Sequence, residues 1–235
     1  MITSKLISLS SNDEGFSIIE SSQLRILLLD IICNEIELKA NSENVQENTV
    51  ENIVHEHFDY FKNKKNRMFS KENTGKVIQF LGNDEIFSYS GEDFVSDEEN
   101  IGHPNIYWRC VRAGSPTDVG SVHADEWFWS LGHGSIPPGY TRVKTWVPII
   151  QGKECGLTIL PGSHNKDFDY KFSLGQDRKK RPQFNNKETL QDMCSANVSI
   201  GNAIIFNDRL LHGGVSSESF RLSVEWTSCI KTKSS

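Results

Sequence analysis

Paired cysteines, long apolar runs and an excess of basic residues are all missing from this 235-residue chain. The five cysteines include no Cys-x-x-Cys pair and are odd in number, which argues against a disulfide framework and against a zinc site. No apolar run approaches membrane-spanning length, and residues 1–11 lack the sustained apolar core of a signal peptide. With a formal net charge of −6, no general polyanion-binding surface is expected. We therefore expect a cytoplasmic protein that binds neither membranes nor nucleic acid.

The length of the chain predicts one domain over residues 1–235, and its apolar pattern changes near residue 100. The first hundred residues favour helices, expected over residues 21–38, 48–61 and 71–80. The acidic stretch 91–100 is expected to be a loop. From residue 101 the apolar residues alternate with a period of two, which is typical of strands. A helical part over 1–100 should therefore lie against a β core over 101–235.

Two stretches far apart in the sequence carry the residue types of a metal site. In an extended segment 121–129, with the sequence SVHADEWFW, His123 and Asp125 would point to the same side. His212 would supply a third ligand. Two imidazoles and one carboxylate with open coordination positions suit the Fe(II) of oxygen-activating enzymes. An isolated His-x-Asp triplet is common on exposed strands and turns, so the prediction of His123, Asp125 and His212 as catalytic metal ligands depends on its context.

That context includes an arginine nine positions after His212. Arg221 lies in the segment Phe220–Trp226, which alternates and is rich in strand-forming residues. A guanidinium in apolar surroundings is costly unless it meets a carboxylate, which its planar fork binds through two N–H groups. The far carboxylate of 2-oxoglutarate has this requirement, because its keto acid end chelates iron.

The order of these motifs resembles the phytanoyl-CoA dioxygenase-like family of Fe(II)/2-oxoglutarate oxygenases. The resemblance is carried by His123-x-Asp125, then CGLTILPGSH at residues 155–164, GNAIIF at residues 201–206, His212 and Arg221. It covers residues 104–227 well and extends thinly to residues 13–20, which look like the opening strand of the family. It implies a mainly β fold with flanking α-helices: a double-stranded β-helix, or jelly-roll, cupin-like barrel, with the N-terminal helices packed on it.

The resemblance also implies how the cosubstrates bind. Arg221 would hold the far carboxylate of 2-oxoglutarate with the help of Ser223 and Trp146, and Arg112 would face the cosubstrate from the strand before the metal motif. The alternatives are a surface position for Arg112 and a purely structural core position for Trp146. Reaction with O2 would release succinate and carbon dioxide. Related halogenases replace the carboxylate ligand with a small residue, so the presence of Asp125 predicts hydroxylation, or a desaturation or ring-forming variant.

The sequence gives weaker evidence about the substrate than about the metal site. Trp127 and Trp129 follow the metal motif directly, and aromatic side chains near polar groups suit a ring or a sugar face. Core packing is the alternative for both tryptophans. We expect a small polar metabolite, a sugar derivative or a natural-product intermediate. Residues 165–197 form a long polar insertion, for which we predict a lid over the barrel mouth.

Two other functional classes remain open at this point. A jelly-roll metal protein can be an isomerase or a hydrolase, which would not require Arg221, or a binding module without catalytic activity. Two further candidate ligands are also set aside. His164 is interpreted as a hydrogen-bonded turn residue, and Asp208 is not needed because Asp125 already supplies the carboxylate.

Overall fold

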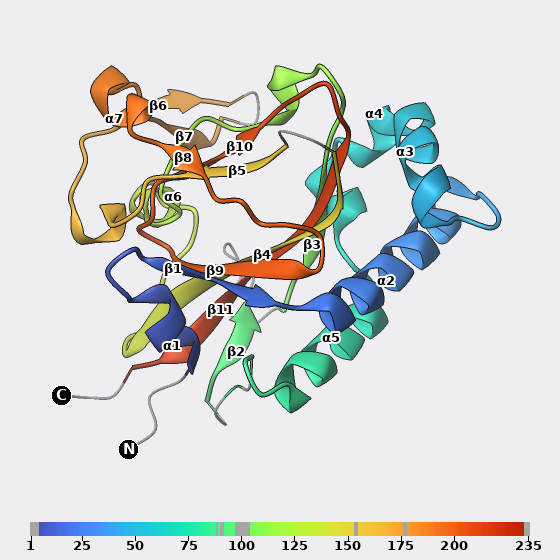
Figure 1. Ribbon diagram of the computed structural model, residues 1–235, viewed down its shortest axis with the longest axis horizontal. Helices are drawn as coiled ribbons and strands as arrows, with labels where there is room; N and C mark the ends of the chain where they lie inside the picture. Colours follow the sequence, from blue (N-terminus) through green and yellow to red (C-terminus); the bar gives the residue numbers. More distant parts are fainter. Residues whose placement is uncertain are drawn as a thin grey trace.

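The computed structural model describes residues 5–87, 89, 92–96, 104–152, 155–175 and 178–232. A large antiparallel sheet and a small antiparallel sheet form the body of the protein, and helices cover the large sheet on one side (Figure 1). The helices are α1 (Lys5–Ser10), α2 (Ser22–Ala40), α3 (Glu47–Glu56), α4 (Phe58–Phe61), η1 (Lys64–Arg67), α5 (Lys71–Asn83), η2 (Pro116–Asp118), α6 (Glu126–Ser130), η3 (Ser163–Asn165) and α7 (Lys187–Gln191).

The large sheet has the strand order β1-β9-β4-β11-β2, and β3 also pairs with β11. The small sheet has the order β10-β5-β8, and β6 and β7 form a separate hairpin. The strands are β1 (Phe16–Glu20), β2 (Phe94–Ser96), β3 (Tyr107–Val111), β4 (Tyr140–Gln151), β5 (Gly156–Ile159), β6 (Lys171–Leu174), β7 (Lys180–Gln183), β8 (Cys194–Ser195), β9 (Asn202–Asn207), β10 (His212–Val215) and β11 (Arg221–Lys231). The predicted mainly β fold with flanking helices is confirmed.

Alternation along the long strands gives the large sheet two different faces. In β11, Leu222 and Val224 belong to the apolar core on the helix side. Their neighbours Arg221, Ser223 and Glu225 are just as buried but must point the other way, toward the small sheet. We call these the outer face and the inner face. The outer face is apolar, whereas the inner face carries polar and charged side chains next to apolar ones, so the inner face is where we expect reactive chemistry.

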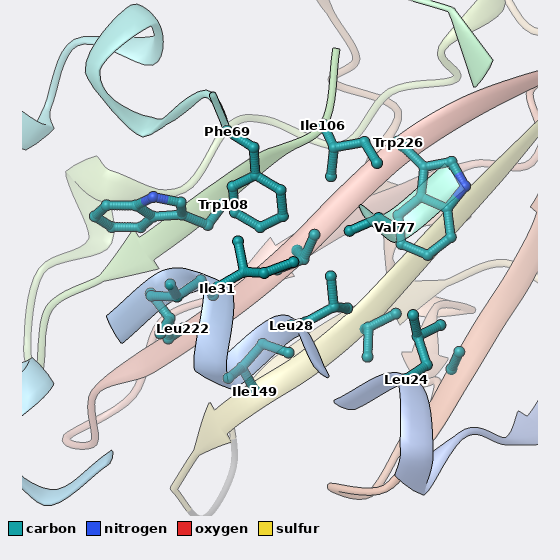
Figure 2. Close-up of a cluster of buried hydrophobic side chains, with 14 of the residues drawn as sticks. Leu24, Leu28, Ile31, Phe69, Val77, Ile106, Trp108, Ile149, Leu222 and Trp226 are labelled. Carbon is teal, nitrogen blue, oxygen red and sulfur yellow. The ribbon is translucent and has the colours of Figure 1, made fainter. Parts of the chain in front are cut away.

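The outer face is built by helices α2 and α5 against strands β3, β4 and β11 (Figure 2). Leu24, Leu28 and Ile31 of α2 recur at helical spacing, which places them in one stripe along the helix. Figure 2 shows this stripe beside Val77 of α5 and Ile149 of β4. All of these side chains are at most 1% exposed, so this cluster supplies much of the apolar burial that stabilises the fold.

The inner face packs against the small sheet through a second, smaller cluster. Trp146 of β4 and Phe206 of β9 meet Leu157 and Ile159 of β5. This contact holds the two sheets together and forms the floor of the space between them. A third cluster lies around Trp127 of α6 and includes side chains of residues 165–197.

The structure differs from the sequence expectations in four local features. The helix expected over 48–61 is interrupted at His57, where the backbone leaves the helical region (φ −106°, ψ 24°). Strand β2 lies within the stretch expected to be a loop, because residues 94–96 pair with the edge of β11; residues 97–100 lie outside the described part. Helix α1 has no counterpart in the expectations. Strand β1 matches the opening strand expected over residues 13–20, but together with β2 it completes the large sheet, so the part over 1–100 is not purely helical.

The insertion over residues 165–197 contains the β6–β7 hairpin, α7 and β8. Its role as a lid stays a prediction. Among the helices of the described ranges, none has both the length and the apolar character needed to cross a membrane.

Candidate metal centre and cosubstrate site

The two predicted histidine ligands are brought together by the backbone itself. The amide N–H of His123 donates to the carbonyl of His212, and that of His212 donates to the carbonyl of His123, both at 2.9 Å. This pair of hydrogen bonds is an isolated antiparallel bridge, which places the two side chains next to each other. The two imidazole ring centroids are 4.6 Å apart.

Asp125 reaches the same point by a different local structure from the one expected. The stretch after His123 is not an extended strand. Asp125 has helical dihedrals (φ −61°, ψ −33°) and begins α6, because β pairing in this segment ends with the single bridge at His123. The turn still directs the carboxylate back toward the imidazoles, with Asp125 Oδ1 at 3.5 Å from His123 Nε2 and 3.9 Å from His212 Nε2.

These three side chains can therefore hold one metal ion. One ligand atom from each residue lies within 4.8 Å of the others, and within the described residues His123, Asp125 and His212 are the group with this property. Asp208 and His164 are buried but belong to no such group. Two nitrogen atoms and one oxygen atom on a single side leave the remaining coordination positions open, which suits Fe(II) in an oxygenase.

Hydrogen bonds behind the rings orient both imidazoles. His123 Nδ1 lies 2.7 Å from the carbonyl oxygen of Ser121, and His212 Nδ1 lies 2.9 Å from that of Leu210. A carbonyl only accepts, so each Nδ1 carries the proton and donates it. Each Nε2 then presents its lone pair toward Asp125, in the tautomer that a metal ligand requires.

The charge states of His212 and Asp125 also suit metal binding. Burial lowers the pKa of His212 to about 4, and the neighbouring His123 adds to this effect. His212 is therefore neutral near pH 7. Burial alone would raise the pKa of Asp125, but the Lys144 ammonium and the two imidazoles hold it well below its usual range. His212 thus offers a neutral nitrogen and Asp125 a carboxylate, the forms in which these groups bind a metal.

Arg221 and Ser223 project from the start of β11 onto the inner face. Arg221 is 2% exposed, and its Nη1 donates to the carbonyls of Gly156 and Val215. Within the described part of the chain, Arg221 Nε and Ser223 Oγ are buried without a hydrogen-bond partner. Buried polar groups normally have a partner, so two unpaired donors side by side indicate a missing acceptor. A carboxylate fits both of them.

An apolar floor connects this arginine with the metal ligands. The Arg221 guanidinium lies 5.9 Å from the Trp146 ring centroid, and Trp146 packs in one cluster with Phe206. The Phe206 ring is in turn 4.8 Å from the His212 ring. A Cβ atom at Gly214 would lie 3.1 Å from Arg221 Nη2, so this glycine leaves the guanidinium its space. The donor set therefore fits 2-oxoglutarate, with metal ligands for its keto acid end and the guanidinium and hydroxyl donors for its far carboxylate.

Arg112 lies apart from the proposed cosubstrate residues Arg221, Ser223 and Trp146. It lies just after β3 in register with Trp108 and Cys110, which face the helices, and so it points to the outer side. Its guanidinium forms two hydrogen bonds with Asp118 and lies 3.5 Å from the ring centroid of Phe58. Strand alternation thus separates Arg112 from Arg221, and the structure does not bring it to the cosubstrate site.

The two tryptophans of α6 have their ring faces in contact with the protein. Trp127 is 6% exposed and stacks on Tyr170 of the insertion, with the ring centroids 4.5 Å apart. The guanidinium of Arg142 lies 3.4 Å from the ring centroid of Trp129. These contacts cover a face of each ring, but Trp127 also lines a cavity beside α6, so the substrate role of the two tryptophans stays a prediction.

From the sequence we predicted no role for two charged residues of the inner face. Lys144 of β4 reaches Asp125, and Glu225 of β11 forms an ion pair with Arg109 at 2.9 Å. The pKa of Glu225 is lowered despite its burial, chiefly by Arg109 and then by Lys144. The alternation in residues 140–150 could have indicated Lys144, because it places this side chain on the same face of the strand as Trp146.

Comparisons with known proteins agree with this geometry. The family model described as Phytanoyl-CoA dioxygenase (PhyH) matches residues 29–223. The solved structure of EctD from S. alaskensis with 2-oxoglutarate and 5-hydroxyectoine is similar at 11% identity and a TM-score of 0.57, over 97% of this chain and 76% of that one. EctD with bound Fe gives 12% identity and a TM-score of 0.55, over 97% and 77%. EvdO2 from Micromonospora carbonacea var. aurantiaca gives 12% and 0.51, over 98% and 92%.

These identities are low, so the structural matches speak for the fold alone, and they confirm the jelly-roll barrel. No curated protein matches the chain.

Proposed function

The chain belongs to the phytanoyl-CoA dioxygenase family of Fe(II)/2-oxoglutarate-dependent oxygenases, and from this we propose that it hydroxylates a small polar metabolite, a sugar derivative or a natural-product intermediate. Iron, 2-oxoglutarate and O2 are the cofactor and cosubstrates of such an enzyme. The observation that carries the proposal is the convergence of His123, Asp125 and His212 on one point beside a buried arginine.

We assign the roles of the residues from their positions. His123, Asp125 and His212 would bind the iron through Nε2, Oδ1 and Nε2. Arg221 would bind the far carboxylate of 2-oxoglutarate, with Ser223 Oγ as a second donor and Trp146 as the wall beside it. When bound, iron and 2-oxoglutarate would supply the oxidising chemistry, with O2 as the oxidant that converts 2-oxoglutarate to succinate and carbon dioxide.

The protein contributes orientation and the exclusion of water. The Nδ1 hydrogen bonds fix both imidazoles, and the packing of Phe206 and Trp146 keeps the floor of the site dry. A rigid, desolvated site limits side reactions of a reactive group. The side chains that we assign to iron and cosubstrate are, apart from His123, no more than 7% exposed, in agreement with this requirement.

A polar substrate is supported by the surroundings of α6, the helix that begins directly after Asp125. A cavity of about 190 Å³ lies there and is lined by charged side chains, including Glu126, Lys166 and Arg209, and by the aromatic Phe168 and Tyr170. Such a mixture suits a ligand with several hydroxyl or charged groups. EctD was crystallised with 5-hydroxyectoine, so in that protein the same fold accommodates a small hydroxylated molecule.

The test is a pair of measurements on the purified protein. Anaerobic addition of Fe(II) and 2-oxoglutarate should produce a weak visible charge-transfer band, and His212→Ala should lose it. His55→Ala, an exposed histidine on α3, is the matched control and should keep it. Admission of O2 should then give succinate, even without substrate. A band without succinate would identify a binding module, and turnover of a substrate without O2 would identify an isomerase or hydrolase.

A further inference from the structure

Lys144 is a buried lysine inside the barrel, and it belongs to none of the sequence motifs of the metal site. It lies in the middle of β4, opposite Phe206 of β9 and Thr227 of β11. Its side chain is 6% exposed, and its Nζ lies 3.8 Å from Asp125 Oδ2. Because Phe206 contacts the His212 ring, β4 runs directly beneath the metal ligands at this point.

The two oxygens of Asp125 therefore face different groups. Oδ1 is the oxygen near both imidazole Nε2 atoms, at 3.5 and 3.9 Å. Oδ2 is the oxygen near Lys144, and it has no hydrogen-bond partner within the described residues. A metal ion held by both imidazoles would meet Oδ1 first. Binding through both oxygens would require Oδ2 to turn away from the ammonium.

A buried lysine next to a metal site is unfavourable in two ways. Its ammonium loses hydration on burial, and it repels a divalent cation a few ångströms away. An apolar residue of similar length at this position would avoid both costs. Besides its electrostatic effect on Glu225, the ammonium can act on Asp125, which an apolar side chain cannot do.

We propose that Lys144 is a positioning residue that restricts Asp125 to one-oxygen coordination of the metal, and so keeps a coordination position open for the cosubstrates. This inference rests on the proposed function and extends it to a residue outside the metal and cosubstrate motifs. Lys144 attracts Oδ2, and the carboxylate can then offer only Oδ1. The consequence is a weakening of metal binding, because the ammonium competes with the metal for the same carboxylate.

The inference predicts opposite changes in metal affinity and in turnover. Removal of the ammonium should tighten metal binding, since the repulsion disappears and Oδ2 becomes available. It should also slow the reaction, since a carboxylate that binds through both oxygens occupies a position that the cosubstrates need. A residue with a merely structural role would weaken both properties when it is replaced.

The experiment compares Lys144→Met, which keeps the length without the charge, with Lys144→Arg, which keeps the charge. Mn(II) is the probe, and its binding is measured from the loss of the free Mn(II) signal in electron paramagnetic resonance. Lys144→Met should bind Mn(II) about tenfold more tightly than the wild type, whereas Lys144→Arg should stay near the wild-type affinity. Succinate formation with Fe(II) should fall in Lys144→Met and recover in Lys144→Arg.

Lys39→Met is the matched control, because Lys39 also pairs with a buried carboxylate, Glu35 at 2.7 Å, but on the helix side. It should lower the melting temperature and leave Mn(II) affinity unchanged. Equal or weaker Mn(II) binding by a folded Lys144→Met protein would overturn the inference. If that variant does not fold, Lys144→Gln gives the same comparison. Failure of the wild type to bind Mn(II) would instead count against the proposed function.

Discussion

The two faces of the large sheet are equally buried and have opposite chemistry. On the outer face, side chains such as Leu222, Val224 and Trp226 pack against helices and are at most 1% exposed. On the inner face, Arg221, Ser223 and Glu225, from the same strand, are at most 8% exposed. One strand thus carries apolar core residues at even positions and, at odd positions, polar residues on the side of the candidate site. The exposed fraction of a side chain therefore does not distinguish the two faces. The chemical type of the buried side chain does.

The comparison shows which part of the protein offsets the unfavourable folding free energy of the buried polar site. Buried charges and unpaired donors on the inner face are unfavourable for folding. The apolar outer face, with its α2 and α5 packing, offsets that cost. Changes to the inner face should therefore act on chemistry, and changes to the outer face should act on stability.

The largest expected effect comes from the metal ligand that both histidines face. Asp125→Ala should abolish succinate formation, because two imidazoles alone hold iron weakly and leave its charge uncompensated. The melting temperature should stay close to that of the wild type. Thermal melts and succinate assays on the same preparation check both statements. Unchanged turnover in Asp125→Ala would show that the ligand assignment is wrong.

Next in size is the loss of the cosubstrate arginine. Arg221→Ala should raise the KM for 2-oxoglutarate by a factor of about 30 or more, because removal of one partner of a desolvated charge pair costs about 2–5 kcal/mol. Saturating 2-oxoglutarate should restore much of the kcat. Steady-state kinetics with varied 2-oxoglutarate measures this, and a KM equal to that of the wild type would remove Arg221 from the site.

On the outer face, the comparison predicts the reverse pattern. Leu28→Ala removes a fully buried side chain from the centre of the α2 stripe and should lower the free energy of unfolding by about 2–5 kcal/mol. The KM for 2-oxoglutarate should not change in the protein that remains folded. Denaturant unfolding together with kinetics at low temperature tests this, and a selective loss of cosubstrate affinity would contradict the division into two faces.

The inner face should also make stability depend on pH when metal is absent. The pKa of His212 is about 4 in the folded protein and about 6.5 in an unfolded chain. At His212 the unfolded state therefore binds more protons in this interval, so the contribution of His212 to stability is full above pH ~6.5 and falls as the pH decreases toward 4, by on the order of 3 kcal/mol. The Asp208 carboxyl, whose pKa burial raises to about 7, acts in the opposite direction over the same interval. Asp125 and Glu225, with lowered pKa values, add to the loss at lower pH.

Melting curves in EDTA between pH 7 and pH 5 measure this dependence. The variant His212→Asn removes this titrating group and keeps Asp208, so on acidification its melting temperature should fall less, or rise more, than that of the wild type. The same change of melting temperature in both proteins would contradict the buried, neutral state of His212.

The smallest effect is expected for Arg112, which sharpens the comparison because it is an arginine on the opposite face from Arg221. Its ion pair with Asp118 is partly exposed, so Arg112→Ala should cost no more than about 1 kcal/mol of stability. The KM for 2-oxoglutarate should equal that of the wild type. A clear rise in this KM would place Arg112 at the cosubstrate after all.

Much of the candidate site follows from local sequence patterns. The ligand types, the alternation around Arg221 and the change of period near residue 100 all depend on neighbours in the chain. They predicted a helical part followed by a β core, whereas the jelly-roll was implied by the family resemblance. The extended conformation expected for residues 121–129 was wrong for α6, because a single bridge to His212 ends the β pairing there. The roles of Trp127 and Trp129 also depended on partners in remote segments, Tyr170 and Arg142.

The sequence by itself determined which residue types the protein could bring to a metal and, through strand alternation, which side chains share a face. The tertiary structure decided which of them meet: His123 with His212 across a bridge between segments 89 positions apart, and Lys144 with Asp125 across the barrel. The physical reason is that alternation fixes the direction of a side chain relative to its own strand, whereas a contact depends on the pairing of strands that are distant in the chain.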